Sequence, residues 1–470
     1  MTLDAATFES LSPSRFICFT VPDPTCSDSL LRVAVLDSPV QPTGSPQVGA
    51  MLVPEGRETD WIFSTKLGHL QLLFSSPGIS RLILIGNQLK EGDSSPHIYH
   101  RPLKFSLHQQ GFEVWSKPLL LALSPRSLLK NGIPEIPILS YVDNLVSSVV
   151  IHECVGHHVG EMLVEDVEIE SEGDEHHGCL KREFRRRLRF KRMPNLIQTE
   201  VRIVVPETDH SLMSVCIEDA KFMLDLRVLV HPYLASMVAS LSVISEYIEG
   251  RIQNEFRPKA LCLGVGGGAL LTFLAIQLGF EVIGVDSDAE ILRVARNYFG
   301  LEGNEFIHVV NGDAIKFMKK VSYQGKHSER SFADSELNGF SHMVDGKVKH
   351  KFDVVMVDLD SSDIRNGTSS PPFEFVRKQV LIAAKLVLSE SGIIAINVIT
   401  QSKSFYDRLV KHFQEVFCEL YKIDVGNDEN FVLVATVSPQ VFTVGDCSNS
   451  FLMRLKLVIP EAYISSIRKL

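Results

Sequence analysis

A glycine-rich turn and an acidic residue that follows it could together hold an adenosine-containing cofactor. The turn runs from Gly264 to Gly268, between an apolar stretch typical of a strand and one typical of a helix. Glycine permits a sharp turn there and lets the backbone approach a ligand more closely than a side chain would allow. Asp286 ends the next apolar stretch, where a carboxylate can accept hydrogen bonds from both hydroxyls of a ribose. The structural alternative is a tight turn, with Asp286 capping the following helix.

Two cofactor classes fit this turn, NAD and S-adenosylmethionine. Gly264, Gly266 and Ala269 satisfy the dinucleotide pattern G-x-G-x-x-[GA]. The end of the chain favours S-adenosylmethionine, because residues 420–425 and 431–437 flank a polar turn and predict an antiparallel hairpin. A strand added in this way to a parallel sheet is typical of Rossmann-like methyltransferases and uncommon in nicotinamide-binding domains.

Acidic residues after two further strand patterns also favour S-adenosylmethionine. Asp313 and Ala314 follow the third strand pattern, where a carboxylate of methyltransferases receives the exocyclic amine of adenine. An acidic cluster at residues 358–363 follows the fourth, beside the crevice where open α/β sheets bind ligands. The structural alternatives are a helix cap for Asp313 and a turn role for Asp363.

Helices and strands alternate from residue 214 to residue 470, and this pattern must position the groups above. It predicts an α/β domain with a Rossmann-like class I methyltransferase sheet, helices on both faces and the C-terminal antiparallel hairpin. Residues 322–351 are polar and too long for a normal connection, which predicts a flexible insertion. Residues 1–150 carry short β-rich runs, such as residues 15–21, 31–36 and 81–85, between Pro, Gly and Ser-rich turns, and they predict an α/β accessory domain.

Residues 151–213 predict a charged β-hairpin between these two domains. Residues 164–170 roughly alternate apolar and acidic side chains, and residues 187–191 alternate basic and apolar ones. Opposite charges facing each other across strands contribute ~0.2 to 1 kcal/mol per pair. The structural interpretation is therefore that the acidic and basic residues form ion pairs across the two strands. The alternative is that the basic run 181–192, with eight Lys or Arg in twelve residues, docks an acidic partner or RNA.

Composition and charge argue against a general nucleic-acid-binding or membrane-spanning protein. Lys and Arg number 47 against 57 Asp and Glu, so the net charge of 47 − 57 = −10 gives no general attraction to phosphate polymers or anionic lipid. Nucleic acid is therefore expected as a partner only through the basic run 181–192. The apolar stretch 222–248 contains Asp225, Arg227 and His231, which argues against a membrane span. Eight scattered cysteines without a C-x-x-C pair fit reduced thiols and a cytoplasmic location.

No metal site is predicted. His152 and His157 are spaced by five residues, which takes the second histidine off the helical face that the zinc motif H-E-x-x-H requires. Cys262 lies inside an apolar strand pattern and is expected to be a core residue.

At these motifs the chain resembles the spermidine synthase-like branch of S-adenosylmethionine-dependent methyltransferases. It resembles most the C-terminal half of the dual methyltransferases of translation elongation factor 1-alpha, the methyltransferase-like protein 13 family. The stretches that carry the resemblance are residues 52–61, 196–200, 264–268, 358–363 and 369–372. The C-terminal module of that family methylates the factor's N-terminal α-amine, and a separate module methylates a lysine. No second glycine loop precedes Gly264, so the lysine-modifying module is not found here.

The resemblance also implies roles for single residues. Gln198 matches a glutamine that touches the methionine part of the cofactor. Asp358 or Asp360 matches the acid beside the reacting amine, and the sequence leaves both open. The cofactor-binding residues that the pattern and the resemblance together predict are Gln198, Gly264, Gly266, Gly268, Asp286, Asp313 and Ala314.

The function predicted from the resemblance is methylation of a protein amine, with elongation factor 1-alpha as substrate and S-adenosyl-L-methionine as cofactor. The first alternative is an aminopropyltransferase that makes polyamines, because residues 360–363 read D-S-S-D as in those enzymes. Against it, Ile364 replaces the usual proline and no Gly-Pro follows. The second alternative is a non-catalytic module that keeps the fold and binds a partner through the basic hairpin.

Overall fold

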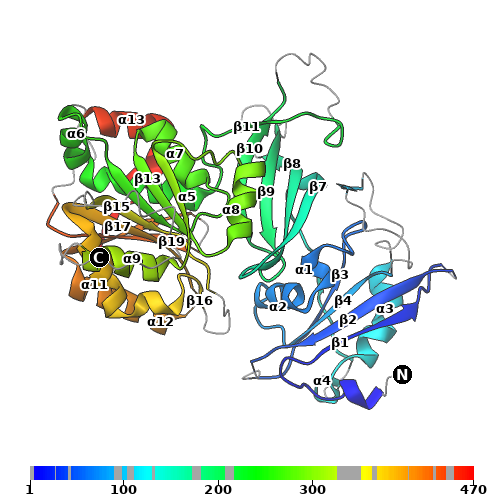
Figure 1. The fold of residues 1–470 in the computed structure, drawn as a ribbon. Coiled ribbons are helices and arrows are strands. Elements are labelled where there is room, and N and C mark those ends of the chain that lie inside the picture. Colours follow the sequence, from blue (N-terminus) through cyan, green and yellow to red (C-terminus); the bar gives the residue numbers. More distant parts are fainter. Residues whose placement is uncertain are drawn as a thin grey trace. The chain divides into compact units, whose positions relative to one another are not determined.

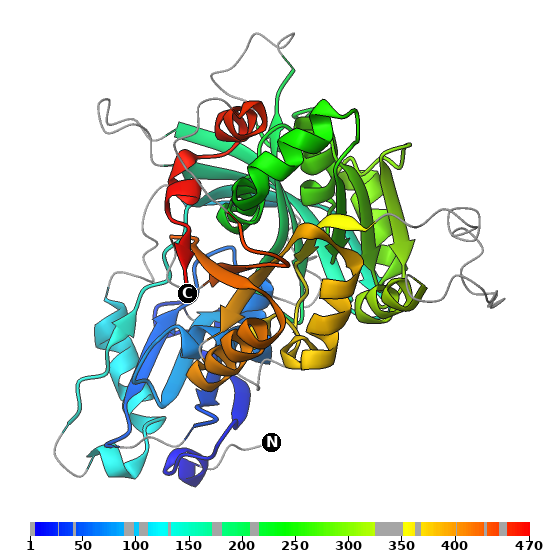
Figure 2. The same ribbon diagram turned by 90° about the vertical axis from the view of Figure 1, so that its left-hand side faces the viewer.

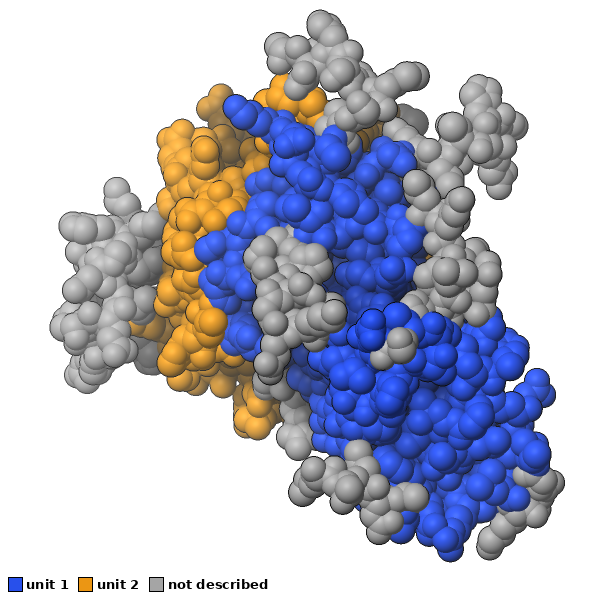
Figure 3. Space-filling view, turned by 90° about the vertical axis from the view of Figure 1, so that its right-hand side faces the viewer, with its two compact units in different colours: residues 1–154, 160–197, 207–221 blue, residues 155–159, 198–206, 222–470 orange. Residues whose placement is uncertain are grey.

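The chain forms two compact units in the computed structural model, coloured separately in Figure 3. The first comprises residues 1–154, 160–197 and 207–221, and the second residues 155–159, 198–206 and 222–470. The structure describes residues 5–26, 28–40, 44–88, 98–102, 111–129, 133–171, 181–206, 216–324, 351–361, 368–400, 402–426, 430–440 and 449–470. The predicted insertion 322–351 therefore falls almost entirely outside the described residues, and the predicted domain boundaries stay a prediction.

The first unit begins with a five-stranded sheet in the order β1-β2-β4-β3-β6. The first three of these strands pair antiparallel, and β3 runs parallel to both of its neighbours. The strands are β1 Phe16–Pro22, β2 Leu30–Asp37, β3 Val48–Leu52, β4 Arg81–Asn87 and β6 Ile138–Leu139. The helices are η1 Ala5–Phe8, α1 Trp61–Ser64, α2 Lys66–Phe74, α3 Phe112–Ala122 and α4 Arg126–Leu129. The β-rich runs predicted near residues 15–21, 31–36 and 81–85 are all strands.

Both faces of this sheet are buried, which explains the unbroken apolar runs 33–36 in β2 and 82–85 in β4. Val33 and Val35 of β2 pack in one hydrophobic cluster with Phe112 of α3. The alternating residues Ala34 and Leu36 pack in a second cluster that contains residues of α1 and α2. Because successive side chains of a strand point to opposite faces, helices on both sides favour apolar residues at successive positions of such a run.

The first unit also contains the predicted charged hairpin. Its strands follow the order β9-β8-β7-β5, with β5 Ile98–His100, β7 Leu145–Gly156, β8 Gly160–Ser171 and β9 Lys181–Phe190. Arg186 lies opposite Asp166 in the antiparallel register and donates two hydrogen bonds to it, of 2.7 and 2.9 Å. Lys191 pairs with Glu161 at 2.8 Å. These acidic and basic residues form ion pairs across the strands, as the structural interpretation of the charge pattern predicted.

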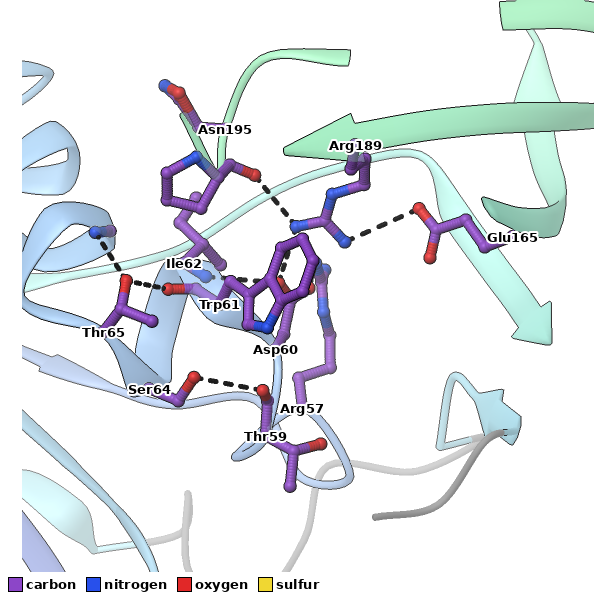
Figure 4. A network of polar contacts seen from close by, with 12 residues as sticks. Arg57, Thr59, Asp60, Trp61, Ile62, Ser64, Thr65, Glu165, Arg189 and Asn195 are labelled. Atoms are coloured by element: carbon purple, nitrogen blue, oxygen red, sulfur yellow. Dashed lines mark hydrogen bonds and ion pairs between the residues drawn. The ribbon is translucent and has the colours of Figure 1, made fainter. Parts of the chain in front are cut away.

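A buried ion network ties this hairpin to the loop before α1 (Figure 4). The guanidinium of Arg189 donates to one oxygen of Asp60 at 2.7 Å, and that of Arg57 to the other at 2.6 Å. Arg189 also lies 3.5 Å from Glu165. Although burial alone would raise it, the charges of Arg189 and Arg57 hold the pKa of Asp60 well below its usual range. The stretch 52–61, which carries part of the sequence resemblance, thus has a structural role within this unit.

The second unit contains the predicted Rossmann-like sheet, in the order β14-β13-β12-β15-β17-β19-β18-β20. The five strands from β14 to β17 are parallel, whereas β19, β18 and β20 pair antiparallel. The strands are β12 Lys259–Leu263, β13 Glu281–Asp286, β14 Ile307–Asn311, β15 Phe352–Val357, β17 Leu388–Thr400, β18 Glu419–Asp424, β19 Asn430–Thr436 and β20 Arg468–Lys469, and β16 Thr368–Ser370 pairs with β17. Counted along the chain from β12 and without β16 and β20, the order is 3-2-1-4-5-7-6. This order, with an antiparallel seventh strand, confirms the predicted fold class.

Helices cover both faces of this sheet, as Figures 1 and 2 show. One hydrophobic cluster contains residues of α5, α6, α7, α8, α13 and α14, and the other contains residues of α9, α11 and α12. These helices are α5 Pro232–Ala239, α6 Ser245–Gln253, α7 Ala269–Leu278, α8 Ala289–Tyr298, α9 Ala314–Gln324, α11 Lys378–Val387, α12 Lys403–Val416, α13 Ser450–Val458 and α14 Glu461–Ser465, with the 3-10 turns η2 Ser240–Ile244 and η4 Phe373–Val376. Cys262 is buried in the first cluster, so its prediction as a core residue is confirmed.

The segment from Met223 to Glu249, whose sequence is largely helical in pattern after an irregular start, is divided into several elements in the structure. It begins with strand β11, Met223–Asp225, which pairs antiparallel with β10, Ile197–Val204. The helix starts only at Pro232, a residue suited to the first helical position because its fixed φ fits a helix and it needs no N–H partner. Within the residues that the structure describes, no helix combines the length and apolar character that crossing a bilayer requires.

Candidate active site

The predicted glycine turn is a loop that only glycine can form. Gly264, Gly266 and Gly268 have φ angles of +92°, +52° and +83°, in the left-handed region. A Cβ atom on Gly264 would lie 2.0 Å from the backbone oxygen of Asp358. The loop therefore lies directly against the end of the neighbouring strand β15, and the sequence needs glycine for both conformation and space.

Asp286 lies beside this loop, as predicted. Its Oδ2 atom accepts hydrogen bonds from the backbone N–H of Val265 at 3.1 Å and of Gly266 at 3.4 Å. Burial raises the pKa of the Asp286 carboxyl, while these backbone hydrogen bonds act in the opposite direction. A carboxylate has about four lone-pair sites, so acceptor capacity for ribose hydroxyls remains.

Every backbone N–H from Gly264 to Gly268 has a partner within the chain. Besides the two bonds to Asp286, Gly264 donates to Val285 O at 2.9 Å and Gly268 to Val265 O at 2.8 Å. Gly267 donates to the side-chain oxygen of Thr199 at 2.7 Å. A loop that cradles phosphate instead points its N–H groups at the ligand. This arrangement fits a cofactor without phosphates better than a dinucleotide, a distinction that the glycine pattern alone could not make.

Asp313 and Ala314 follow β14 at the same edge of the sheet. Asn311 at the end of β14 lies opposite Asp286 in the parallel register. The Asp313 side chain is exposed, and its Oδ1 accepts a hydrogen bond from the Lys316 N–H at 2.9 Å. The helix-cap role weighed for Asp313 is thus present, and it uses one of the two carboxylate oxygens. Ala314 is buried at the start of α9.

Gln198 lies on β10 next to the glycine loop. Its backbone oxygen is 3.8 Å from the position that a Cβ on Gly266 would take, and the neighbouring Thr199 contacts the loop directly. The structure therefore brings Gln198, which is distant in sequence, to the predicted cofactor loop.

Asp358 is held in place by two residues that the sequence analysis did not single out. The phenol of Tyr233 donates to its Oδ2 at 3.0 Å, and the amide of Asn397 donates to its Oδ1 at 3.1 Å. Burial raises the pKa of the Asp358 carboxyl, and the two hydrogen bonds act against that shift. Burial and the negative charge of Asp358 raise the pKa of Tyr233, which therefore stays a neutral donor.

Asp360 follows two residues later and is partly exposed. The structure thus places both candidate catalytic acids after β15, and Tyr233 and Asn397 fix the orientation of Asp358. The backbone of this acidic segment is also held, since Ser361 N–H donates to Ser369 O at 2.8 Å. Ser362 and Asp363, the rest of the D-S-S-D stretch, lie outside the described residues.

The residues His152 to Gly156 form the end of strand β7. A strand places successive side chains on opposite faces, so the helical geometry of an H-E-x-x-H zinc site does not arise there.

Comparison with known proteins confirms the resemblance that the motifs predicted. No family model matches the chain. The human protein named eEF1A lysine and N-terminal methyltransferase is 25% identical over 423 residues, which are 86% of this chain and 53% of that protein. Its homolog from Drosophila melanogaster is 24% identical over 445 residues, 92% of this chain and 56% of that protein. The chain thus spans about half the length of these curated relatives.

A more distant relative and two solved structures complete the comparison. A polyamine aminopropyltransferase of Vibrio vulnificus is 22% identical over 182 residues, 38% of this chain and 50% of that protein. Human methyltransferase-like protein 13, solved in complex with SAH, is 21% identical with a TM-score of 0.39, and the match covers 48% of this chain and 91% of that chain. A probable spermidine synthase from Corynebacterium glutamicum is 12% identical with a TM-score of 0.40, covering 68% and 89%.

Proposed function

We propose that this chain is an S-adenosylmethionine-dependent methyltransferase that acts on a protein amine. One observation carries the proposal: the glycine loop, Asp286 and Asp358 converge at the carboxyl ends of adjacent parallel strands, where open α/β sheets bind ligands. The internally satisfied N–H groups of the loop support an adenosyl cofactor over a dinucleotide. Relatives named as methyltransferases over more than four fifths of the chain support the same class.

The cofactor would be held by residues whose positions suit its parts. Gly264, Gly266 and Gly268 allow its close approach, and Asp286 would accept the ribose hydroxyls. Asp313 and Ala314 would face the adenine, and Gln198 the methionine part. When bound, the cofactor supplies an electrophilic methyl group, and no metal is needed for its transfer to an amine.

Asp358 and Asp360 would receive the substrate amine. Tyr233 and Asn397 fix the Asp358 carboxylate, so an incoming ammonium would meet an acceptor of defined orientation. Holding the neutral amine in line with the methyl group is a proximity effect that can supply ~7 to 11 kcal/mol. The acids would orient the ammonium and pass its proton to water.

The substrate that fits best is an N-terminal α-amine. Its pKa of ~7.7 to 8.0 means that deprotonation at pH 7 costs only ~1 to 1.4 kcal/mol, whereas a lysine at ~10.4 costs ~4.6 kcal/mol. The described part of the site offers carboxylates and a neutral phenol, and these are weak bases at pH 7. The names of the relatives point to elongation factor 1-alpha as the carrier of this amine.

A cytoplasmic location follows from this substrate and fits the thiols. Among the described residues, Cys18, Cys26, Cys216, Cys262 and Cys418 are free thiols. Free thiols of this kind are typical of reducing compartments.

Recombinant chain should be incubated with methyl-labelled S-adenosylmethionine and purified elongation factor 1-alpha. Label on the N-terminal peptide is the expected result, and Asp358→Asn should lower turnover at least tenfold while Asp407→Asn, an exposed aspartate on α12, should not. Asp360→Asn is compared in parallel to settle which acid matters. Full turnover in both Asp358→Asn and Asp360→Asn would remove the catalytic assignment.

Polyamine synthesis is the second candidate, favoured by the D-S-S-D stretch and by the Vibrio vulnificus relative. That relative matches only 38% of the chain. Decarboxylated cofactor with putrescine distinguishes the two activities: spermidine formation without protein methylation would establish the second candidate and overturn the first.

A further inference from the structure

We propose that Thr199, a strand residue 65 positions before the glycine loop, positions that loop for cofactor binding. The inference rests on the proposed cofactor site and extends it to a residue with no expected cofactor contact. It concerns the second unit alone, to which both Thr199 and the loop belong.

The first observation is a buried hydrogen bond. Thr199 is 5% exposed, and its Oγ1 accepts the Gly267 N–H at 2.7 Å. Gly267 lies at the turn between β12 and α7, where no strand or helix partner is available to this N–H. A buried N–H without an acceptor is costly, so Thr199 supplies what the local backbone cannot.

The second observation is close steric contact. A Cβ atom on Gly266 would lie 2.9 Å from Thr199 Oγ1, and one on Gly267 would lie 2.5 Å from Thr199 Cγ2. The threonine side chain therefore packs directly against the loop backbone from the side of β10. Loop displacement in this direction would meet both the methyl and the hydroxyl group.

The third observation is that β10 is a firm support. It pairs with β11, and the guanidinium of Arg202 on β10 donates to the buried carboxylate of Asp225 on β11, with the Nε atom at 3.1 Å. Arg227 donates to the same carboxylate at 2.9 Å. Leu224 of β11 and Leu226 in turn lie against Gly300, just after α8. Thr199 thus lies on a strand that is held in the second unit by its pairing with β11 and by the contacts of β11.

Asp286 and Thr199 hold different parts of the same loop. Asp286 binds the Val265 and Gly266 N–H groups from the cofactor side, and Thr199 binds the Gly267 N–H from β10. Without Thr199 the loop would lose the hydrogen bond and the packing contact that fix its position relative to β10. Cofactor affinity should fall, because the loop would have to be ordered at the expense of binding.

Calorimetric titration with S-adenosylhomocysteine tests this role in the full chain. Thr199→Val keeps the shape and removes the acceptor, and we expect the dissociation constant to rise about tenfold, which corresponds to about 1.4 kcal/mol. Thr199→Ser keeps the hydroxyl and should retain most of the affinity. The matched control is Thr272→Val: this threonine of α7 is 2% exposed, and its Oγ1 has no hydrogen-bond partner among the described residues, so affinity should stay unchanged.

Two further measurements distinguish positioning from general stability. In turnover assays, Thr199→Val should raise KM for S-adenosylmethionine more than it lowers kcat at saturation. Hydrogen exchange of peptides covering residues 264–270 should accelerate in Thr199→Val and not in Thr199→Ser. The inference is overturned if Thr199→Val binds as wild type does, if Thr272→Val loses affinity equally, or if Thr199→Val does not fold. Wild-type chain that binds no S-adenosylhomocysteine would instead refute the proposed function.

Discussion

The ion network around Asp60 predicts that Asp60→Asn strongly destabilises the first unit. The substitution removes the only negative charge that bonds both Arg57 and Arg189 in the network described above, and these side chains are just 8% and 13% exposed. Breaking a buried ion pair in this way costs about 3 to 5 kcal/mol, because a charge is left buried without its partner. Arg57 keeps Asp143 and Arg189 keeps Glu165, so we expect about 3 kcal/mol.

Equilibrium urea denaturation followed by tryptophan fluorescence measures this loss specifically. The two tryptophans of the chain, Trp61 and Trp115, both lie in the first unit, so the signal reports on that unit. Glu161→Gln is the control, since its pair with Lys191 is exposed and such pairs contribute about 0 to 1 kcal/mol. A loss below about 1 kcal/mol in Asp60→Asn, within the range of an exposed pair, would refute the reasoning.

The same network predicts a pH dependence with a definite sign. The pKa of Asp60 is depressed in the folded chain, so its stabilising effect is fully present above its unfolded pKa of ~3.9 and is lost as pH falls toward the folded value. Asp60→Asn should therefore flatten part of the decline in stability below about pH 4. An equally steep acid decline in wild type and variant would contradict this assignment.

Three further predictions concern the second unit. Gly264→Ala should abolish measurable binding of S-adenosylhomocysteine in calorimetry, since its Cβ would collide with Asp358 O; retained affinity would show that the loop is not where the cofactor binds. Tyr233→Phe should lower kcat about tenfold and leave cofactor affinity intact, because it releases Asp358 without touching the loop; equal loss of both would contradict the separate roles. Asp288→Asn should lower the midpoint of thermal unfolding by several degrees, because Asp288 accepts N–H bonds from His158, Val159 and Glu290, and an unchanged midpoint would exclude this bracing role.

The sequence predicted the Rossmann-like sheet well because its signals are local. Apolar strand stretches, the glycine turn and the polar residues that end each strand all lie within a few positions of one another. Since carboxyl ends of parallel strands share one edge, the approach of Asp286 to the glycine loop also followed from the pattern. The short strand β11 at the start of segment 223–249 was harder to predict. It is three residues long and is defined by its pairing with β10, so the sequence shows no strand periodicity there.

The residues that the sequence did not reveal depend on contacts distant in the chain. Tyr233 reaches Asp358 across 125 positions and Thr199 reaches Gly267 across 68. No local pattern encodes such pairs. Asn397 could have been noticed, since a lone amide within the apolar strand 393–399 must find a buried partner. The sequence could not identify that partner, because Asp358 follows a different strand, β15.

Mass spectrometry of elongation factor 1-alpha from cells with and without this chain tests the central proposal most directly. The account predicts that removing the chain removes methyl mass from the N-terminal peptide, and that expression of wild type, but not of Gly264→Ala, restores it. An N-terminal peptide of identical mass in both cell lines would contradict the proposed substrate.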